Sequence, residues 1–413
     1  MKRAAALTVT LCVAVWAVAR WAIFDFFQLG DTRVYEHAAR MMDAGAIPYR
    51  DFDVEYPPLA TGLFWLVGQA PGGDYQLAFS MAMLACLSAT ALAALVVARR
   101  IGLGRARTAV AVVVVALTPL LLGTLVQTRY DLLLSALLGW VLVAALHDRF
   151  RWAWTLLAIA TAVKLVPVLL VPALVLWHRH RRAGRQQLVG VTGFAVGVAA
   201  TFAPFFVIAP QATWRLFAYH LDRPPEVESL GSSILHATGL DFRRVQSYGS
   251  DNVTGSWADA FASLSTLLIV VAVAAIALWT WRALRRGSGD GAEVFVAAVA
   301  ASLVASVLLG KVISPQYMVW LLPAVLLVPG RWGRIGVATM IVAMPLTQAV
   351  FPPLFASFVE RAAELPVWLL LARNMLLVLL VAAVWPRCPR HNGPVRHDIP
   401  SQAHEARSNR MTT

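Results

Sequence analysis

Apolar stretches about as long as a bilayer is thick follow one another along most of this chain, separated by short polar loops. A helix of roughly 20 apolar residues crosses the hydrocarbon core of a membrane. The pattern therefore predicts an all-α polytopic membrane protein with about 11 to 13 transmembrane helices. The expected spans are residues 4–27, 75–98, 108–126, 131–146, 186–207, 260–281, 292–310, 317–328, 335–351 and 366–385, with a shorter interfacial or re-entrant helix at 59–69.

The stretch 152–177 departs from this pattern. It is flanked on both sides by arginines of the kind that stay in the cytoplasm, namely Arg149, Arg151, Arg179 and Arg181. One straight span cannot place both of its ends on the same side of the membrane. We expect instead two short helices that meet near Lys164 and Pro167, which places Lys164 at the outer side.

The charges of the chain are unevenly distributed. Only 14% of the residues are charged and 59% are hydrophobic, yet the formal net charge is +13. Basic residues gather in every second loop, which predicts that these loops and both termini are cytoplasmic. The excess of positive charge therefore reflects topology and not a nucleic-acid surface. Two long extracytoplasmic loops, 28–57 and about 208–259, follow from this orientation. We expect one transmembrane domain, 1–385, and a disordered cytoplasmic tail, 386–413.

Neither a signal peptide nor a cysteine framework is predicted. The apolar stretch after Lys2 and Arg3 is longer than a typical signal sequence and no clear cleavage site follows it, so we expect an uncleaved first helix. The three cysteines, Cys12, Cys86 and Cys388, are too few and too scattered for a disulfide framework or a metal site.

An acidic cluster lies directly before the predicted helix 59–69, in the sequence "DFDVEYPPLA". Its Asp-x-Asp resembles the metal motif of soluble nucleotide-sugar transferases, but nucleotide sugars are cytoplasmic and this loop is predicted to lie outside. Sugars outside the membrane travel on polyprenyl phosphate. Three roles are then open for Asp51, Asp53 and Glu55. They bind hydroxyl groups of the molecule that accepts such a sugar, brace the loop through Arg33, Arg40 or Arg50, or form a solvated face of the loop. Tyr56 and the two prolines after it stiffen the return to the membrane.

Several cations and polar residues are predicted at the outer boundary, where a phosphate needs positive charge. The candidates for phosphate binding are Lys164, Lys311, Arg129, His220 with Arg223, and Arg373, which interrupts an apolar helix. Each can alternatively extend its side chain to lipid headgroups. Gln316 and Tyr317 are candidates for bonds to sugar hydroxyls or for simple interfacial residues. Trp214, Trp257 and Trp320 are expected to anchor the interface.

Three segments resemble glycosyltransferase family 87, the polyprenol-phosphate-mannose-dependent mannosyltransferases of the GT-C class that are common in actinobacteria. The segments are "GDTRVYEHAARMMDAGAIPYRDFDVEYPPLATGLF", "TAVKLVPVLLVPAL" and "KVISPQYMVWLLPAV", in the same order as in the family. The resemblance implies a GT-C-like helical bundle that moves a sugar from a polyprenyl-phosphate donor to a lipid or cell-envelope glycan on the extracytoplasmic face of the cell membrane.

The resemblance also implies a mechanism. In an inverting transfer one carboxylate removes the proton of the acceptor hydroxyl, and a cationic pocket receives the phosphate, so neither a metal nor another cofactor is needed. The family's base is an Asp shortly after the first helix, which corresponds to Asp31 in "GDTRVY". Asp31 also precedes a helix-compatible stretch and can serve as its N-cap.

Two other classes of function remain open at this stage. A transporter or flippase of lipid-linked sugars also places charges at breaks in membrane helices, although repeats are then expected. A non-catalytic membrane scaffold accounts for the helices but not for the acidic first loop. Label that moves onto a second lipid identifies a transferase, whereas movement across the membrane without a new bond identifies a transporter.

Overall fold

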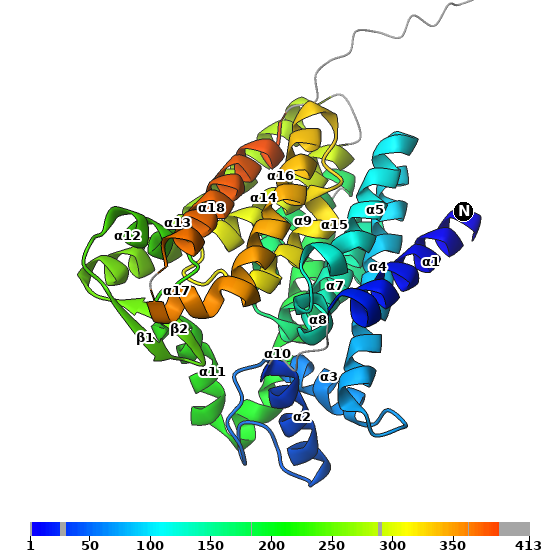
Figure 1. The fold of residues 1–413 in the computed structure, drawn as a ribbon. Helices are drawn as coiled ribbons and strands as arrows, with labels where there is room; N and C mark the ends of the chain where they lie inside the picture. The colour runs from blue at the N-terminus through cyan, green and yellow to red at the C-terminus, as the bar shows by residue number, and fades with distance from the viewer. Residues whose placement is uncertain (1, 25–29, 183, 288–290, 362, 388–413) are drawn as a thin grey trace, which may run out of the picture.

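The protein is described by a computed structural model that covers residues 2–24, 30–182, 184–287, 291–361 and 363–387. Helices make up nearly all of its regular structure, which confirms the prediction of an all-α polytopic membrane protein (Figure 1). The predicted tail lies outside the described residues from 388 onward, as do residues 25–29, where the first predicted span ends and the first long loop begins.

Within the described residues, seven stretches are long and apolar enough to cross a membrane. They are α1 (Lys2–Val18) with η1 (Ala19–Ile23), α4 (Tyr75–Arg100), α10 (Gln186–Ile208), α13 (Ser256–Arg286), α14 (Ala292–Leu309), Gly330–Glu360 and α18 (Glu364–Val384). The sixth of these contains α16 (Gly330–Ala349), η4 (Val350–Leu354) and most of α17 (Phe355–Arg361). Three shorter apolar helices are α3 (Pro58–Gly68), α7 (Asp131–Leu146) and α8 (Phe150–Val163).

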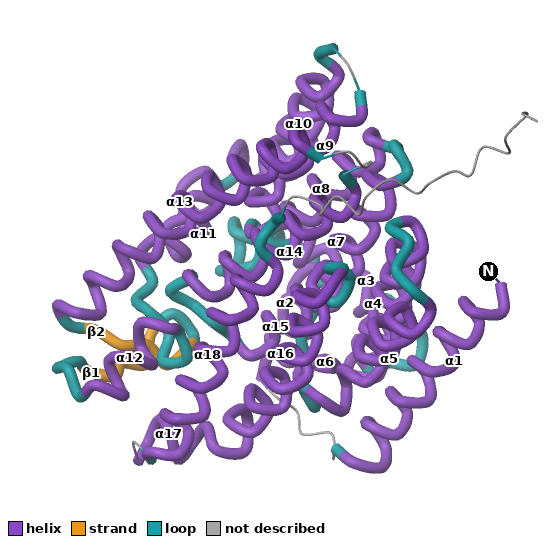
Figure 2. Tube along the Cα trace, turned by 90° about the horizontal axis from the view of Figure 1, so that it is seen from above, coloured by secondary structure: helices purple, strands orange, loops and turns teal. Residues whose placement is uncertain are grey.

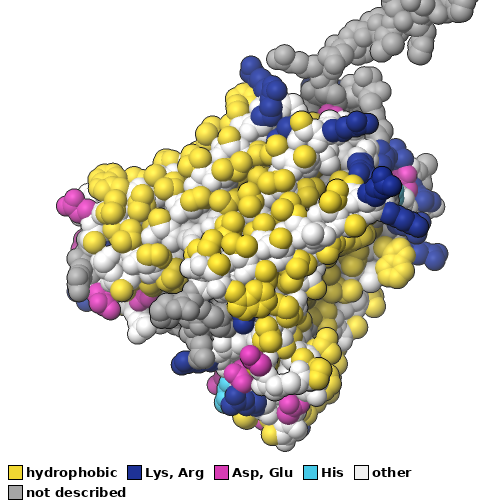
Figure 3. Space-filling view, turned by 45° about the vertical axis from the view of Figure 1, so that its right-hand side comes forward, with side chains coloured by type: hydrophobic (Ala, Val, Ile, Leu, Met, Phe, Trp, Pro, Cys, Tyr) yellow, Lys and Arg dark blue, Asp and Glu magenta, His cyan; other side chains and the backbone are white. Residues whose placement is uncertain are grey.

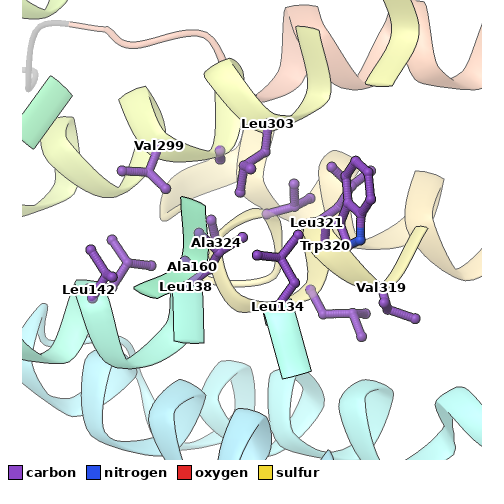
Figure 4. Close-up of a cluster of buried hydrophobic side chains, with 14 of the residues drawn as sticks. Leu134, Leu138, Leu142, Ala160, Val299, Leu303, Val319, Trp320, Leu321 and Ala324 are labelled. Atoms are coloured by element: carbon purple, nitrogen blue, oxygen red, sulfur yellow. The ribbon is translucent and has the colours of Figure 1, made fainter. Parts of the chain in front are cut away.

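The core of the bundle lies where α7, α8 and α14 meet α15 (Met318–Val325). Figure 4 shows leucines of α7 facing Val299 and Leu303 of α14 and the side chains of α15. Most residues of α14 are buried, which explains why this helix is apolar on every side. By contrast, α10 and α13 leave many apolar side chains exposed, among them Val196 and Leu267.

One face of the molecule is largely apolar and has charged edges. Figure 3 shows hydrophobic side chains over most of one face, while most of the Lys and Arg side chains in that view gather along its upper right edge. A wide apolar surface is what lipid tails require. The structure is therefore that of a multi-pass membrane protein.

The predicted break at Lys164 is confirmed. Helix α8 ends at Val163, Lys164 has an extended backbone (φ −157°, ψ 132°), and η2 (Val166–Leu170) and α9 (Val171–Arg181) follow. The end of α9 returns to the start of α8, because the His178 ring stacks on Phe150 with centroids 3.8 Å apart. Both ends of the hairpin thus lie on the same side, as the flanking arginines require, and Lys164 lies at its turn.

Another predicted span is divided. In place of one helix over 108–126, α5 (Arg105–Leu121) ends early and a single turn, α6 (Leu125–Thr128), follows. Gly123 lies between them with φ +61°, a left-handed conformation that glycine adopts without steric cost. This interruption brings the end of α6 and the start of α7 to the polar end of the bundle.

The two long loops contain regular structure that the hydropathy pattern did not indicate. The first contains α2 (Gly30–Asp43). The second contains α11 (Pro210–Asp222), α12 (Leu230–Thr238) and an antiparallel pair of strands, β1 (Arg243–Ser247) and β2 (Ser250–Thr254). In Figures 1 and 2 the strands lie beside α12, at the opposite side of the molecule from the N-terminus. One turn, η3 (Pro315–Tyr317), leads into α15.

Candidate active site

A cavity of about 600 Å³ lies where the two long loops meet the ends of the core helices. Its polar wall is formed by α2, the segment before α3, the start of α7, the turn at Lys164, α11, the segment before α12 and η3. Apolar side chains form another part of the wall, from Leu165, Val166 and Leu169 near η2, Ile269 on α13, and Phe351 and Phe355. The cavity thus combines charged groups with an apolar lining.

Asp31 lies in the first turn of α2 and lines the cavity. Its Oδ2 atom forms an ion pair with Arg129, which comes from the turn between α6 and α7. The Tyr35 hydroxyl, one helical turn further on, donates to the same oxygen at 3.4 Å. Both contacts engage Oδ2, and the Asp31 side chain is 24% exposed. A ligand in the cavity can therefore approach the second carboxylate oxygen.

Lys164 is held in a cage of aromatic rings. Its Nζ donates to Asp131 Oδ1 at 2.7 Å and lies 4.7–5.0 Å from the ring centroids of Tyr130, Tyr317 and Trp320. Trp320 Nε1 donates to the same Asp131 oxygen at 2.8 Å. The carboxylate fixes the position of the ammonium, and the rings stabilise its charge away from bulk water.

Two further acids line the cavity from the segment before α12. Glu226 accepts from the Ser314 hydroxyl at 3.2 Å and lies 3.7 Å from Arg223, and Glu228 lies 3.6 Å from Arg373. Both side chains are almost completely buried. Burial raises the pKa of both carboxyl groups, and it raises that of Glu228 to about 8.

His220 and Lys311 complete the basic side of the wall. Lys311 Nζ donates to the Leu221 carbonyl at 2.6 Å, which ties η3 to α11. His220 lines the cavity, and part of its side chain is exposed. Even so, removal of its ring from bulk water and the repulsion from nearby cations, Lys164 first among them, lower its pKa to about 4. Its ring is therefore neutral near pH 7.

The acidic cluster of residues 51–55 does not act as a unit. Glu55 and Tyr56 line the cavity. Asp51 instead pairs with Arg50 at 2.8 Å, which holds the pKa of its carboxyl low, at about 2, as the bracing interpretation expects. The Asp53 side chain is 91% exposed and lies 3.4 Å from Arg215. Neither Asp51 nor Asp53 is among the lining residues.

The remaining predicted site residues also divide into some that line the cavity and others that lie outside it. Gln316 and Tyr317 of η3 line the cavity, and the Tyr317 ring stacks on Trp320 with centroids 3.8 Å apart. Arg373 is fully buried behind the wall, where its Nη2 donates to the Glu228 carbonyl at 2.8 Å. The expectation that Trp320 anchors an interface was wrong, because its side chain is 1% exposed and packs in the cage. Trp214 and Trp257 are exposed.

Sequence reasoning missed Asp131, Glu226 and Glu228 as lining residues. For Asp131 a signal existed, because a carboxylate at the outer end of one predicted helix faces the lysine that interrupts the next. Glu226 and Glu228 lie in "RPPEVESL", which has no membrane pattern, and their burial follows from contacts with η3 and α18.

Comparison with known proteins gives one family. No curated protein matches the chain. The model of glycosyltransferase family 87 matches residues 55–315, which is more than half of the chain and runs from Glu55 at the cavity to the start of η3. Asp31 lies well before the matched range, and Gln316 directly follows it. The match includes Lys164 and the two glutamates before α12. Because the matched family consists of glycosyltransferases, it does not fit a scaffold without catalytic activity. The chain is a membrane glycosyltransferase and belongs to glycosyltransferase family 87.

Proposed function

We propose that this glycosyltransferase transfers mannose from a polyprenyl-phosphate carrier to a glycolipid or cell-envelope glycan. The transfer takes place at the extracytoplasmic face of the cell membrane. One observation carries the proposal. The cavity combines a carboxylate, Asp31, with two cations, Arg129 and Lys164, and with an apolar wall. That wall includes Ile269 of α13, and Leu267 on the same helix is 58% exposed. Such a cavity suits a donor whose sugar phosphate is polar and whose tail remains in the lipid.

The proposed chemistry is an inverting displacement. Asp31 accepts the proton of the acceptor hydroxyl through the oxygen that Arg129 and Tyr35 do not engage. The hydroxyl oxygen then bonds to the anomeric carbon while the bond from that carbon to the phosphate oxygen breaks, and polyprenyl phosphate leaves with the electron pair. Charge grows on the leaving oxygen, so cations aimed at it lower the barrier.

Arg129 and Lys164 are the cations that we assign to the phosphate. Arg129 Nε is buried and has no hydrogen-bond partner among the described residues. Lys164 is fixed by Asp131 and can turn a second N–H toward the cavity. Lys311 and His220 also line the cavity, and we assign them to the acceptor together with Glu55 and Tyr56. Arg373 supports this wall from behind, Asp51 braces the first long loop, and the exposed Asp53 lies outside the cavity.

The orientation in the proposal rests on the basic loops. Every second loop is rich in arginine, and the loops that carry the cavity are the others. The donor class and the mannose rest on the family resemblance of the three segments quoted above.

Purified protein in lipid nanodiscs tests the proposal. Polyprenyl-phosphate [¹⁴C]mannose, the arabinose analogue and nucleotide-activated mannose are each offered with extracted membrane lipids. We expect label from polyprenyl-phosphate mannose to appear on a second lipid or glycan. Transfer from the nucleotide sugar alone refutes the donor class, and preference for arabinose refutes mannose. Movement of the labelled carrier across the bilayer without a new bond supports a flippase instead.

A further inference from the structure

Two nearly buried side chains present unsatisfied oxygen atoms in the cavity wall. Glu226 and Gln316 are 7% and 8% exposed, and both line the cavity. Glu226 Oε2 and Gln316 Oε1 have no hydrogen-bond partner among the described residues. A buried acceptor without a partner destabilises a protein, so two of them beside one cavity indicate a ligand that supplies donors.

The two side chains belong to one rigid part of the wall. The Ser314 hydroxyl donates to Glu226 Oε1 at 3.2 Å, and the Glu226 backbone N–H donates to the Lys311 carbonyl at 2.8 Å. Gln316 follows in the next turn, η3. Glu226 is therefore held by one carboxylate oxygen and keeps the other for a ligand.

The charges near this pair indicate a neutral ligand. Arg223 lies 3.7 Å from Glu226 and Arg373 lies 3.6 Å from Glu228, so these paired groups have no net positive charge to attract a phosphate. A metal ion would find too few ligands, because no three His, Cys, Asp or Glu side chains come together for one in the described part of the chain. Sugar hydroxyl groups are neutral and can both donate and accept hydrogen bonds.

We infer that Glu226 and Gln316 form a subsite that binds hydroxyl groups of the donor sugar while it is attached to the carrier. The inference rests on the proposed function. Gln316 directly precedes Tyr317, whose ring centroid is 4.8 Å from Lys164 Nζ. A sugar linked to a phosphate at Lys164 therefore lies beside this wall. The acceptor sugar enters on the other side of the anomeric carbon, near Asp31.

Binding measurements in the Asp31→Asn background, which keeps the donor intact, test the subsite. The probes are polyprenyl-phosphate mannose and bare polyprenyl phosphate. Glu226→Gln and Gln316→Leu are expected to weaken binding of the sugar-bearing lipid about tenfold each, the effect of one lost hydrogen bond to a buried or charged group, without weakening binding of the bare lipid. Asp148→Asn, which alters a carboxylate paired with Arg181 away from the cavity, serves as the matched control.

The two lipids separate a binding role from a structural one. If both variants bind the sugar-bearing lipid as the background does, or lose both lipids equally, the subsite is refuted. If the background protein binds neither lipid, the proposed function itself fails. Gln316→Leu decides the question alone if Glu226→Gln does not fold.

Discussion

Asp31 and Arg129, the base and the phosphate-binding cation of the proposed mechanism, are in direct contact. They neutralise each other in the cavity wall, although α3, α4 and α5 lie between them in the sequence. An acceptor hydroxyl that hydrogen-bonds to Asp31 and a phosphate that pairs with Arg129 can together replace this contact. The ion pair thus keeps both groups in place before the substrates bind.

Asp31→Asn is expected to lower turnover about a hundredfold to ten-thousandfold, because the amide cannot take up the acceptor proton. Turnover of polyprenyl-phosphate mannose by the purified variant measures the effect. Asp43→Asn is the matched control, since Asp43 lies in the same helix and bonds to Trp65 and Gln69 away from the cavity. Near-normal turnover of Asp31→Asn would reassign the base, with Glu55 as the next candidate.

Lys164 and Asp131 form a buried pair, and their variants separate catalysis from stability. Lys164→Met leaves the Asp131 carboxylate buried without its partner, which costs about 3–5 kcal/mol of folding free energy. The double variant Lys164→Met/Asp131→Asn removes that buried charge and is expected to melt at a higher temperature than Lys164→Met. Its turnover is expected to remain low, because the cation for the phosphate is still missing. Recovery of both stability and turnover would limit Lys164 to a structural role.

The segment before α12 connects the cavity to α18. Arg373 binds the Glu228 carbonyl, and Asn374 Nδ2 donates to the Ser233 hydroxyl at 2.7 Å. A polar seam of this kind inside an apolar helix pair fixes how α12 docks on α18, because its buried groups have few other partners. The position of Glu226 in the cavity depends on this docking.

The pH dependence of stability tests the state of Glu228. Burial raises the pKa of its carboxyl from 4.5 to about 8, so the folded state retains a proton that the unfolded state releases between these values. This contribution to stability is complete below pH 4.5 and is lost as the pH rises toward 8. Glu228→Gln cannot lose a proton, so its melting temperature relative to wild type is expected to rise from pH 5 to pH 8. An opposite trend would show that Arg373 keeps Glu228 ionised.

At the scale of the whole molecule, both long loops and the ends of core helices together line the polar cavity. The sidedness of that cavity decides whether lipid-linked or nucleotide sugars can reach the site. Orientation and chemistry are therefore linked.

Cysteine labelling tests this orientation in a background without the native cysteines. Ala44→Cys and Thr238→Cys introduce exposed thiols in the two long loops, and Ala106→Cys introduces one in the first turn of α5, between Arg105 and Arg107. A membrane-impermeant maleimide is expected to label the first two in intact cells and the third only after permeabilisation. Labelling of Ala106→Cys in intact cells would reverse the orientation and move the site to the cytoplasm.

The sequence by itself determined the features that depend on local composition. Long apolar runs specify membrane helices because unpaired backbone groups are costly in lipid. Arginines on both sides of 152–177 predicted the hairpin at Lys164, which the contact between α9 and α8 confirms. The three segments that resemble family 87 indicated a membrane glycosyltransferase, and the family match agrees.

Only the tertiary structure decided which charges meet. Asp131 joins Lys164 from 33 residues away and Trp320 from 189, whereas Asp53, two residues from Glu55, points away from the cavity. Hydropathy and loop charge describe each segment's preference for lipid or water, and many packings satisfy those preferences equally. Which packing forms depends on shape and on pairing between distant buried groups, because a buried charge is stable only beside a specific partner.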